Sequence, residues 1–316
     1  MKRKAFCLLL ILSFLILPEA AADGDYIKWV DFDVSCNAME RALLLEQQYR
    51  EQDRVVNWID ILALAATRYG SGKFPVSQVD KAAKELTGDR SPQEFLGNQY
   101  KYYQYYQEAY GAVLRGLVGT YAIQKQDGTW ETYYGVKAFS PIAAGYWYSH
   151  YDDFGVSRSY GFQRRHLGND LMGSLGTPIV AVEGGTVEAL GWNQYGGWRV
   201  GIRSFDNQRY YYYAHLRKDT PYAPGLEVGD TVQAGDVIGF MGRTGYSTKE
   251  NVNNIEVVHL HFGLQLIFDE SQKECNSEIW VDVYDIVNFL EQHRSSVRFN
   301  EETKVWERIY PYRDLG

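Results

Sequence analysis

Four of the six histidines in the sequence lie between residues 166 and 261, in short segments whose spacing could bring their side chains together. His259 and His261 are two residues apart in the apolar run VVHLHFGLQLIF, which predicts a buried strand. Because side chains at positions i and i+2 of a strand point to the same face, the two imidazoles should be neighbours. His166 and Asp170 flank Leu-Gly-Asn, which favours a turn that directs both side chains toward one point.

Side chains of these types suit a zinc centre. A catalytic zinc site needs three protein ligands and a fourth position left open. His166, Asp170 and one histidine of the HLH pair supply that number. The other histidine of the pair and His215, at the end of YYYYAHL, could move protons and stabilise an oxyanion. The alternative is a structural one, in which each histidine separately hydrogen-bonds the backbone.

Four segments in this order resemble the lysostaphin/LytM-type zinc endopeptidases, which cut peptidoglycan peptides. The segments are RRHLGNDLMGSLGTPIVAVEGGTVEAL, YYYYAHL, VQAGDVIGFMGRTGYST and HLHFGLQ. The similarity runs from about Asp153 to Ile267, and the combination of His-x-x-x-Asp with His-x-His is its most specific part.

The resemblance implies an antiparallel β fold with a groove over one zinc ion per chain. It implies that His166, Asp170 and His261 are the zinc ligands and that His215 and His259 are the catalytic histidines. Two features depart from the family pattern: Val258 stands where proline commonly precedes the His-x-His strand, and an Asn-rich segment, YSTKENVNNIEVV, lengthens the preceding loop. Both put the shape of the groove, and hence the cleaved bond, in question.

Two kinds of structure must position these residues. Between Asn37 and Tyr121 the apolar residues follow helical spacing, which predicts four helices, with a capping box formed by Asn37 and Glu40. From about residue 123 short Val, Ile, Tyr and Phe runs alternate with tight turns, which indicates an antiparallel sandwich or flattened barrel. The fold class is therefore α+β. The expected divisions are a signal peptide at 1–22, a helical domain at 23–122, a peptidase domain at 123–297 and a loose polar tail at 298–316.

Two tyrosine patterns and one C-terminal segment call for an interpretation. In the last predicted helix Tyr103, Tyr106 and Tyr110 recur with Leu114 and Leu117 at helical spacing, so core packing is favoured over a sugar-stacking platform. Residues 210–213 are four consecutive tyrosines in a predicted strand, so two should face the core and two the groove or solvent. The segment DVYDIVNFLEQHRSSV is predicted to form one closing helix.

The N-terminus and the charge indicate an exported protein. MKRK precedes an apolar run too short for a comfortable membrane span, and small residues follow, so cleavage is expected near Asp23, with an uncleaved anchor as the alternative. Removing residues 1–22 takes away three basic side chains and one acidic one, which changes the formal net charge from −8 to −10. Such a charge argues against a nucleic-acid partner. Cys36 and Cys275 could form a disulfide or remain two thiols.

Three classes of function are compatible with these patterns. The first is an exported zinc endopeptidase that acts on the peptides of the bacterial cell wall or periplasm. The second is a wall-binding or scaffold protein that keeps the fold and no longer cuts, although all five chemical positions are filled. The third is a carrier domain, because VQAGDVIGFMG resembles turns of biotinyl and lipoyl domains, but that turn has no lysine to modify. His150 and His293 lie outside the motifs and are expected to be ordinary surface histidines. The oligomeric state is left open.

Overall fold

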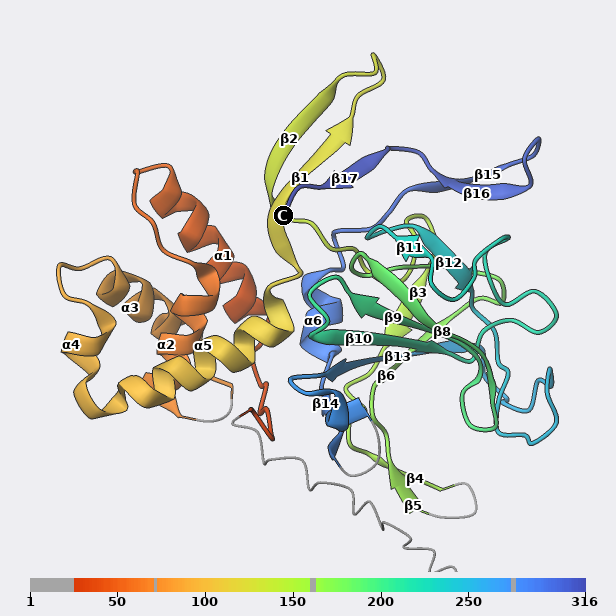
Figure 1. Cartoon of the computed structure of the whole chain (residues 1–316), viewed down its shortest axis with the longest axis horizontal. Coiled ribbons are helices and arrows are strands. Elements are labelled where there is room, and N and C mark those ends of the chain that lie inside the picture. The colour runs from red at the N-terminus through yellow and green to blue at the C-terminus, as the bar shows by residue number, and fades with distance from the viewer. Residues whose placement is uncertain (1–25, 71–72, 160–162, 274–276) are drawn as a thin grey trace, which may run out of the picture.

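The computed structural model describes residues 26–70, 73–159, 163–273 and 277–316. An N-terminal group of helices lies beside a larger, sheet-rich part that contains most of the remaining chain (Figure 1). Every pair of named strands in the described residues is antiparallel. The predicted order of helices followed by antiparallel sheet is therefore confirmed. The predicted signal peptide at 1–22 and the cysteine at position 275 lie outside the described residues.

The helical part contains four longer helices and one short one. Its members are α1 (Cys36–Arg50), α2 (Trp58–Tyr69), α3 (Val76–Leu86), α4 (Pro92–Leu96), the 3₁₀ turn η1 (Gly97–Gln99) and α5 (Tyr100–Leu114). The predicted capping box at Asn37 and Glu40 is wrong. The first helix begins two residues earlier, because the Ser35 side chain accepts a hydrogen bond from the Ala38 backbone N–H at 3.3 Å and so caps it. The capping box of this region belongs instead to α4, at Ser91 and Glu94.

Helix α2 forms the centre of this part, with buried residues from Trp58 to Ala66 that pack between the neighbouring helices. It ends at Gly70, whose φ of 96° is readily adopted only by glycine. The tyrosine stripe of α5 packs as predicted, since Tyr103, Tyr110 and the two leucines that follow are buried in the core. The side chains of the last predicted helix thus contribute packing.

The main sheet has the strand order β11-β8-β9-β10-β13-β6-β3, with β14 also paired to β13. Its strands are β3 (Tyr148–His150), β6 (Asn169–Gly173), β8 (Gly185–Asn193), β9 (Gly197–Ser204), β10 (Arg209–Ala214), β11 (Thr231–Val232), β13 (His259–Leu266) and β14 (Ile279–Val281). The tyrosines of β10 alternate as predicted. Tyr211 and Tyr213 are buried in the core, and Tyr210 and Tyr212 line a groove on the opposite face.

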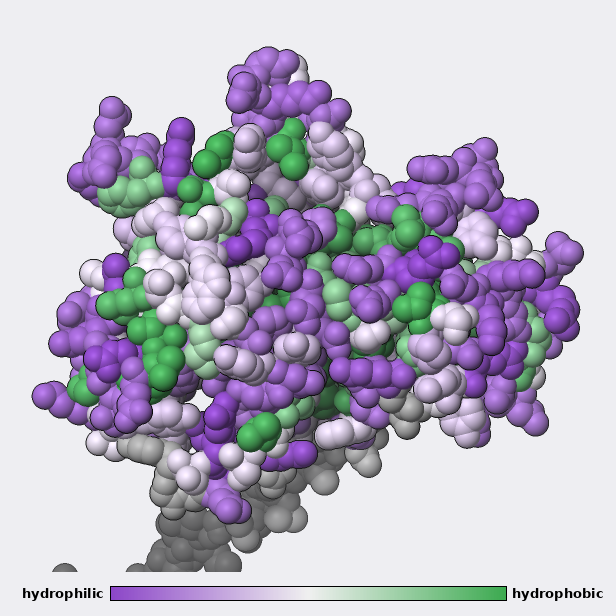
Figure 2. Space-filling view, turned by 180° about the vertical axis from the view of Figure 1, so that it is seen from behind, coloured by the Kyte–Doolittle hydropathy of each residue, from purple (hydrophilic) through white to green (hydrophobic). Residues whose placement is uncertain are grey.

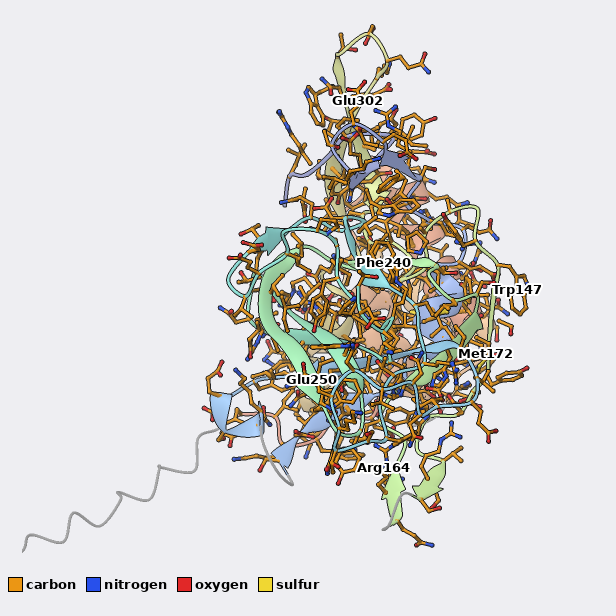
Figure 3. All side chains as sticks on the ribbon, turned by 90° about the vertical axis from the view of Figure 1, so that its right-hand side faces the viewer. Trp147, Arg164, Met172, Phe240, Glu250 and Glu302 are labelled. Carbon is orange, nitrogen blue, oxygen red and sulfur yellow. The ribbon has the colours of Figure 1, made fainter. Side chains whose placement is uncertain are left out.

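Smaller pairs of strands complete the sheet-rich part. They are β4 (Ser157–Ser159) with β5 (Gln163–Arg165), β7 (Pro178–Val180) with β12 (Val237–Phe240), and β15 (Val297–Asn300) with β16 (Val305–Arg308). The first of these hairpins projects away from the main sheet, with Arg164 on its second strand (Figure 3). A short 3₁₀ turn, η2 (Glu270–Lys273), follows β13.

The C-terminal residues differ from the prediction. The closing helix α6 (Tyr284–Phe289) has only six residues. The tail is not loose, because β17 (Tyr312–Asp314) pairs with β1 (Val118–Gln124), which in turn pairs with β2 (Trp130–Val136). Tyr312 is buried in this three-stranded sheet, and its hydroxyl donates a hydrogen bond to the Lys137 carbonyl at 2.8 Å. The β structure also begins at Val118, before the expected boundary.

A buried ion pair joins the helical part to the main sheet. Arg209 of β10 contacts Glu183 at 2.8 and 3.1 Å and donates a third hydrogen bond to the Ala112 carbonyl of α5 at 2.8 Å.

On the face seen in Figure 2, hydrophilic side chains predominate and hydrophobic ones form scattered patches. Within the described residues, none of the helices combines the length and the apolar character that crossing a membrane requires.

Candidate metal centre

Three of the predicted side chains converge on one point of the main sheet. His166 Nε2 lies 3.0 Å from Asp170 Oδ1 and 2.8 Å from His261 Nδ1, and the last two atoms lie 3.1 Å apart. Asp170 and His261 are direct cross-strand partners in the β6–β13 pair. His166 reaches them from the irregular segment just before β6, in agreement with the predicted turn.

A second layer of residues orients these three. His166 Nδ1 donates a hydrogen bond to the Asp153 carbonyl at 3.0 Å, which leaves Nε2 facing the cluster. The Asp153 carboxylate also lies 3.2 Å from that ring nitrogen and accepts from Arg158 at 2.6 Å. Arg158 then contacts the outer oxygen of Asp170 at 3.1 Å. Supporting hydrogen bonds of this kind fix the ring orientation and tune the ligands of a metal.

The cluster favours positive charge between its members. Burial of the His166 ring opposes its charged form, but hydrogen bonds to Asp153 and Asp170 outweigh this and raise its pKa to about 9. Burial likewise favours the neutral form of Asp170, but hydrogen bonds from His166 and His261 hold the pKa of that carboxyl well below its usual range. Burial lowers the pKa of His261. The carboxylate is therefore ionised, and a proton or a metal cation is stabilised beside it.

The donor set fits zinc. Two imidazole nitrogens and one carboxylate oxygen, all within 4.8 Å of one another, are the ligands of an open catalytic zinc site. Three acceptor atoms held 2.8–3.1 Å apart repel one another unless a positive group lies between them. Ligands bound to zinc at about 2.0–2.2 Å in a tetrahedron are separated by roughly 3.3 Å, close to the spacing found here.

The two remaining predicted histidines border the cluster. The ring centroid of His215 lies 4.8 Å from that of His259 and 5.9 Å from that of His261, and His259 Nε2 lies 3.8 Å from Asp170 Oδ1. The Nδ1 of His215 donates to the Thr244 carbonyl at 2.8 Å, and that of His259 to the Val257 carbonyl at 2.9 Å. In each ring Nε2 is therefore the nitrogen that remains for chemistry. Burial, with His259 and His261 nearby, holds the pKa of His215 well below its usual range.

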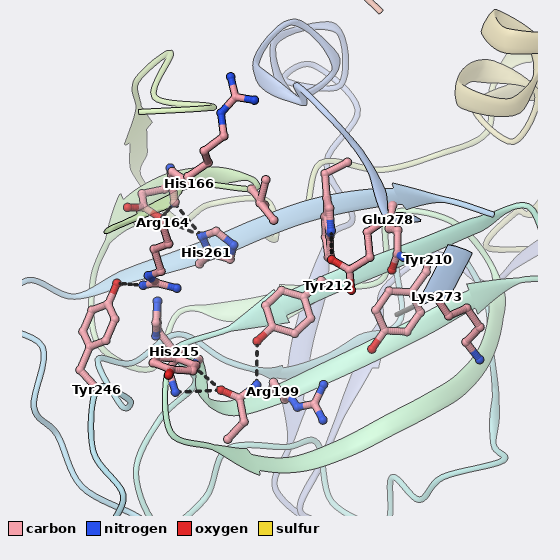
Figure 4. A pocket seen from close by; sticks show the side chains of 18 of the residues that line it. Arg164, His166, Arg199, Tyr210, Tyr212, His215, Tyr246, His261, Lys273 and Glu278 are labelled. Carbon is pink, nitrogen blue, oxygen red and sulfur yellow. Dashed lines mark hydrogen bonds and ion pairs between the residues drawn. The ribbon is translucent and has the colours of Figure 1, made fainter. Parts of the chain in front are cut away.

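A groove of about 560 Å³ opens over the cluster (Figure 4). Four of the five predicted site residues line it: His166, Asp170, His215 and His261. The fifth, His259, is buried and is not part of the lining. The rest of the lining combines aromatic rings with cations and a few acids. These residues include Arg164, Arg165, Glu188, Asn193, Tyr195, Arg199, Tyr210, Tyr212, Tyr246, Lys273, Glu278 and Trp280.

The structure thus brings all five predicted site residues together and leaves two other histidines apart. His293 is exposed, as expected. The expectation for His150 is wrong: its ring is partly buried, donates to the Asn288 side-chain carbonyl at 3.0 Å and packs on Tyr284. Sequence reasoning missed Asp153 and Arg158 as supports of the ligands, since neither belongs to a motif of ligand-like spacing.

Comparisons with known proteins agree with this geometry. Residues 164–274 match the model of "Peptidase family M23". The chain is 38% identical over 117 residues to the L-Ala–D-Glu endopeptidase of Bacillus subtilis. The aligned segment covers 37% of this chain and 34% of that protein. It is 38% identical over 98 residues to the lysostaphin of Staphylococcus simulans, which covers 31% of this chain and 17% of that protein. The chain thus spans about a third of the length of the first of these curated relatives and less of the second.

A solved structure extends the likeness beyond the matched segment. A candidate glycyl-glycine endopeptidase LytM from Ruminococcus gnavus is 27% identical, with a TM-score of 0.55 over 81% of this chain and 88% of that one. Because 81% of the chain is more than the sheet-rich part from Val118 onward, the overlap includes helical residues as well as the sheet. The predicted resemblance is confirmed: the chain contains a peptidase family M23 domain, homologous to the L-Ala–D-Glu endopeptidase and to lysostaphin.

Proposed function

We propose that the protein is an exported, zinc-dependent endopeptidase that hydrolyses peptide bonds of bacterial peptidoglycan. The observation that supports this most strongly is the convergence of His166, Asp170 and His261 at one end of a groove, with two further histidines beside them. The names of the relatives support the substrate class, because they include an L-Ala–D-Glu endopeptidase and a glycyl-glycine endopeptidase. We infer export from the apolar N-terminal segment and the small residues after it.

In this proposal the three ligands would hold one zinc ion per chain. When bound, the metal supplies a Lewis acid that polarises the scissile carbonyl and lowers the pKa of water. Asp153 keeps the Nε2 of His166 directed at the metal, because its carbonyl occupies the other ring nitrogen. Arg158 holds the outer oxygen of Asp170, so that the inner oxygen stays on the ligand side.

The two other histidines would handle the proton and the developing negative charge. In both rings Nδ1 is held by a backbone carbonyl, so Nε2 is the atom at which either can accept a proton and donate it later to the leaving amine. Because their rings are 4.8 Å apart, protonation of one disfavours protonation of the other. His215 lines the groove, which supports its predicted role next to the substrate carbonyl. His259 borders the ligand carboxylate, which supports its predicted role as the acceptor of the water proton.

The experiment that tests this function separates coordination from catalysis. Zinc content and the rate of peptide release from purified peptidoglycan are measured for the wild-type protein and five alanine variants. We expect His166→Ala, Asp170→Ala and His261→Ala to lose zinc and activity together, because one of three ligands is removed. We expect His215→Ala and His259→Ala to keep zinc and to lose most of the rate.

His293→Ala is the matched control, since this histidine is exposed and lies outside the site. His150→Ala is not a suitable control, because the His150 side chain is partly buried and hydrogen-bonded. Mass spectrometry of the released fragments identifies the bond. Zinc content unchanged in all three ligand variants would refute the assignment. A wild-type protein that binds peptidoglycan and releases no peptide would instead support the alternative of a non-cutting wall-binding or scaffold protein.

A further inference from the structure

Arg199 lies in the same row of the sheet as the metal ligand His261. In the β9–β10 pair Val200 faces Tyr213, and in the β10–β13 pair Ala214 faces His261. One step along β9 from Val200, Arg199 is level with Ala214 and hence with His261. Alternation along the strand places Arg199 on the groove face, and it is part of the groove lining (Figure 4).

The backbone at Arg199 is held firmly. The Tyr222 hydroxyl donates to the Arg199 carbonyl at 3.2 Å and accepts from the Gly191 N–H of the neighbouring strand at 2.7 Å. On the same face, two residues further on, Gly201 leaves room for Tyr210, because a Cβ there would lie 1.9 Å from the Tyr210 hydroxyl. The arginine therefore projects from a firmly held strand into the groove.

The guanidinium of Arg199 has no anionic partner within the described part of the chain. Its Nε is buried without a hydrogen bond, and no carboxylate there lies within 4.0 Å of its nitrogens. Two other cations on this side of the sheet are paired with an acid, and Arg165 is exposed at the rim of the groove. Lys273 contacts Glu188 at 2.5 Å, and Arg203 contacts the same carboxylate at 2.8 Å. A buried, unpaired guanidinium nitrogen is costly unless a ligand provides the acceptor.

A second arginine adds to the positive field near this point. Burial raises the pKa of Tyr212, but Arg199 and Arg164 both oppose that shift, so both guanidinium groups act on the same stretch of the groove. Arg164 is already engaged, because it donates to the Tyr246 hydroxyl and lies 5.4 Å from the centre of the Tyr195 ring. Of these two arginines Arg199 is thus the one left to bind a ligand, in a protein whose net charge is −8.

We propose that Arg199 is a specificity-determining residue that binds a carboxylate of the substrate close to the cleaved bond. The inference rests on the proposed function and narrows its substrate class to peptides that carry an acidic group there. Neighbouring strands are about 4.8 Å apart, so two strand spacings separate the Arg199 and His261 backbones by roughly 10 Å. An extended peptide covers this in about three residues. A peptide made only of glycine would leave the guanidinium unpaired.

The test compares two peptidoglycan stem peptides that differ in one group. In one the α-carboxyl of D-glutamate is free, and in the other it is converted to the amide, which has nearly the same shape and no charge. The ratio of kcat/KM for the two peptides is measured for the zinc-loaded wild-type protein, Arg199→Gln and Arg199→Lys. A charge-assisted hydrogen bond corresponds to about a 10- to 100-fold preference for the carboxylate in the wild-type protein.

We expect Arg199→Gln to bring this ratio to near one. Arg199→Lys should give an intermediate ratio, because lysine keeps the charge and loses the planar pair of donors. Arg298→Gln is the control for loss of a positive charge, since Arg298 is exposed on the β15–β16 hairpin, away from the groove. Binding of both peptides to the His259→Ala protein, with and without Arg199→Gln, gives the same comparison without turnover.

The two proposals fail in different ways. Hydrolysis of both peptides with equal kcat/KM by the wild-type protein, and an unchanged ratio in Arg199→Gln, would overturn the role of Arg199 and leave the endopeptidase standing. Hydrolysis of peptidoglycan but of neither stem peptide would likewise overturn this inference alone. Absence of hydrolysis of peptidoglycan and of both peptides, with zinc bound, would overturn the proposed function and this inference with it. Equal melting temperatures and zinc contents for the variants verify that the ratio reports on recognition and not on folding.

Discussion

Substitution of Gly168 tests the candidate metal centre, because a single added methyl group would contact the proposed ligand His261. This glycine lies between His166 and Asp170. A Cβ at the position would lie 2.5 Å from the Phe262 carbonyl oxygen and 2.9 Å from Cε1 and Nε2 of His261. Ordinary carbon–oxygen contacts are about 3.3 Å or longer, so the chain segments must separate by roughly 0.8 Å to accommodate alanine.

A displacement of this size is large for a metal site. Ligand distances tolerate about 0.2 Å, and a 1 Å misplacement at a catalytic centre costs on the order of 100-fold in rate. The Phe262 carbonyl belongs to strand β13 and cannot rotate away, so the ring of His261 and the loop with His166 must move instead. We expect Gly168→Ala to weaken zinc binding by about 10- to 100-fold, the range seen when supporting residues of a metal site are lost. The rate of peptide release should fall at least as much.

The assay is zinc affinity by competition with a chelator, measured beside the rate of peptidoglycan hydrolysis at saturating zinc. Gly135→Ala is the matched control, because Gly135 lies in strand β2 and a Cβ there would meet only the end of the Gln47 side chain at 3.7 Å. Wild-type zinc affinity and rate in Gly168→Ala would refute the reasoning, since the close contacts would then be relieved without moving a ligand.

Two further predictions concern residues that support the site. Asp153→Asn should lower zinc affinity by about 10- to 100-fold in the same chelator assay, because the carboxylate near His166 is lost while the side-chain shape is kept; unchanged affinity would show that the Asp153 carbonyl alone orients the ring. Arg209→Met should lower the free energy of unfolding in urea by about 3–5 kcal/mol, since Glu183 stays buried without its partner. Arg298→Met, on an exposed pair, should change it by less than about 0.5 kcal/mol, and equal losses in the two variants would contradict the role given to the buried pair.

Features with a short local cause were predictable from the sequence. The i, i+2 spacing of His259 and His261 places both rings on one side of β13, and the structure has them bordering the same cluster. The alternation of the tyrosines in β10 follows from the same rule. Gly70 ends α2 because glycine adopts a positive φ without strain. Each of these needs no knowledge of distant parts of the chain.

Features that depend on distant partners were missed. Asp153 supports His166 from 13 residues away through its own carbonyl, an atom that every residue possesses and that has no signature in the sequence. The tail is ordered because β17 adds to the edge of β1, nearly 200 residues earlier, and no periodicity of the tail itself records that pairing. His150 is partly buried because Asn288 of α6 meets it across the fold. In each case tertiary contact decides the structure and local pattern does not.

Strands β9, β10 and β13 carry the groove on one face and core residues on the other, which explains how the site can be rigid. On β10 the groove residue Tyr212 lies between Tyr211 and Tyr213. Both of these pack against Phe262 of β13 in the core, Tyr211 in a stacked and Tyr213 in a tilted arrangement. The Tyr213 hydroxyl accepts a hydrogen bond from the Val182 backbone N–H, and the Tyr211 hydroxyl donates to Glu183. Glu183 in turn pairs with Arg209, which is bonded to α5. Packing of the helical part against this end of β10 therefore restrains the strand that separates Arg199 from His261. A site built on restrained strands keeps the separation of the proposed metal and carboxylate subsites.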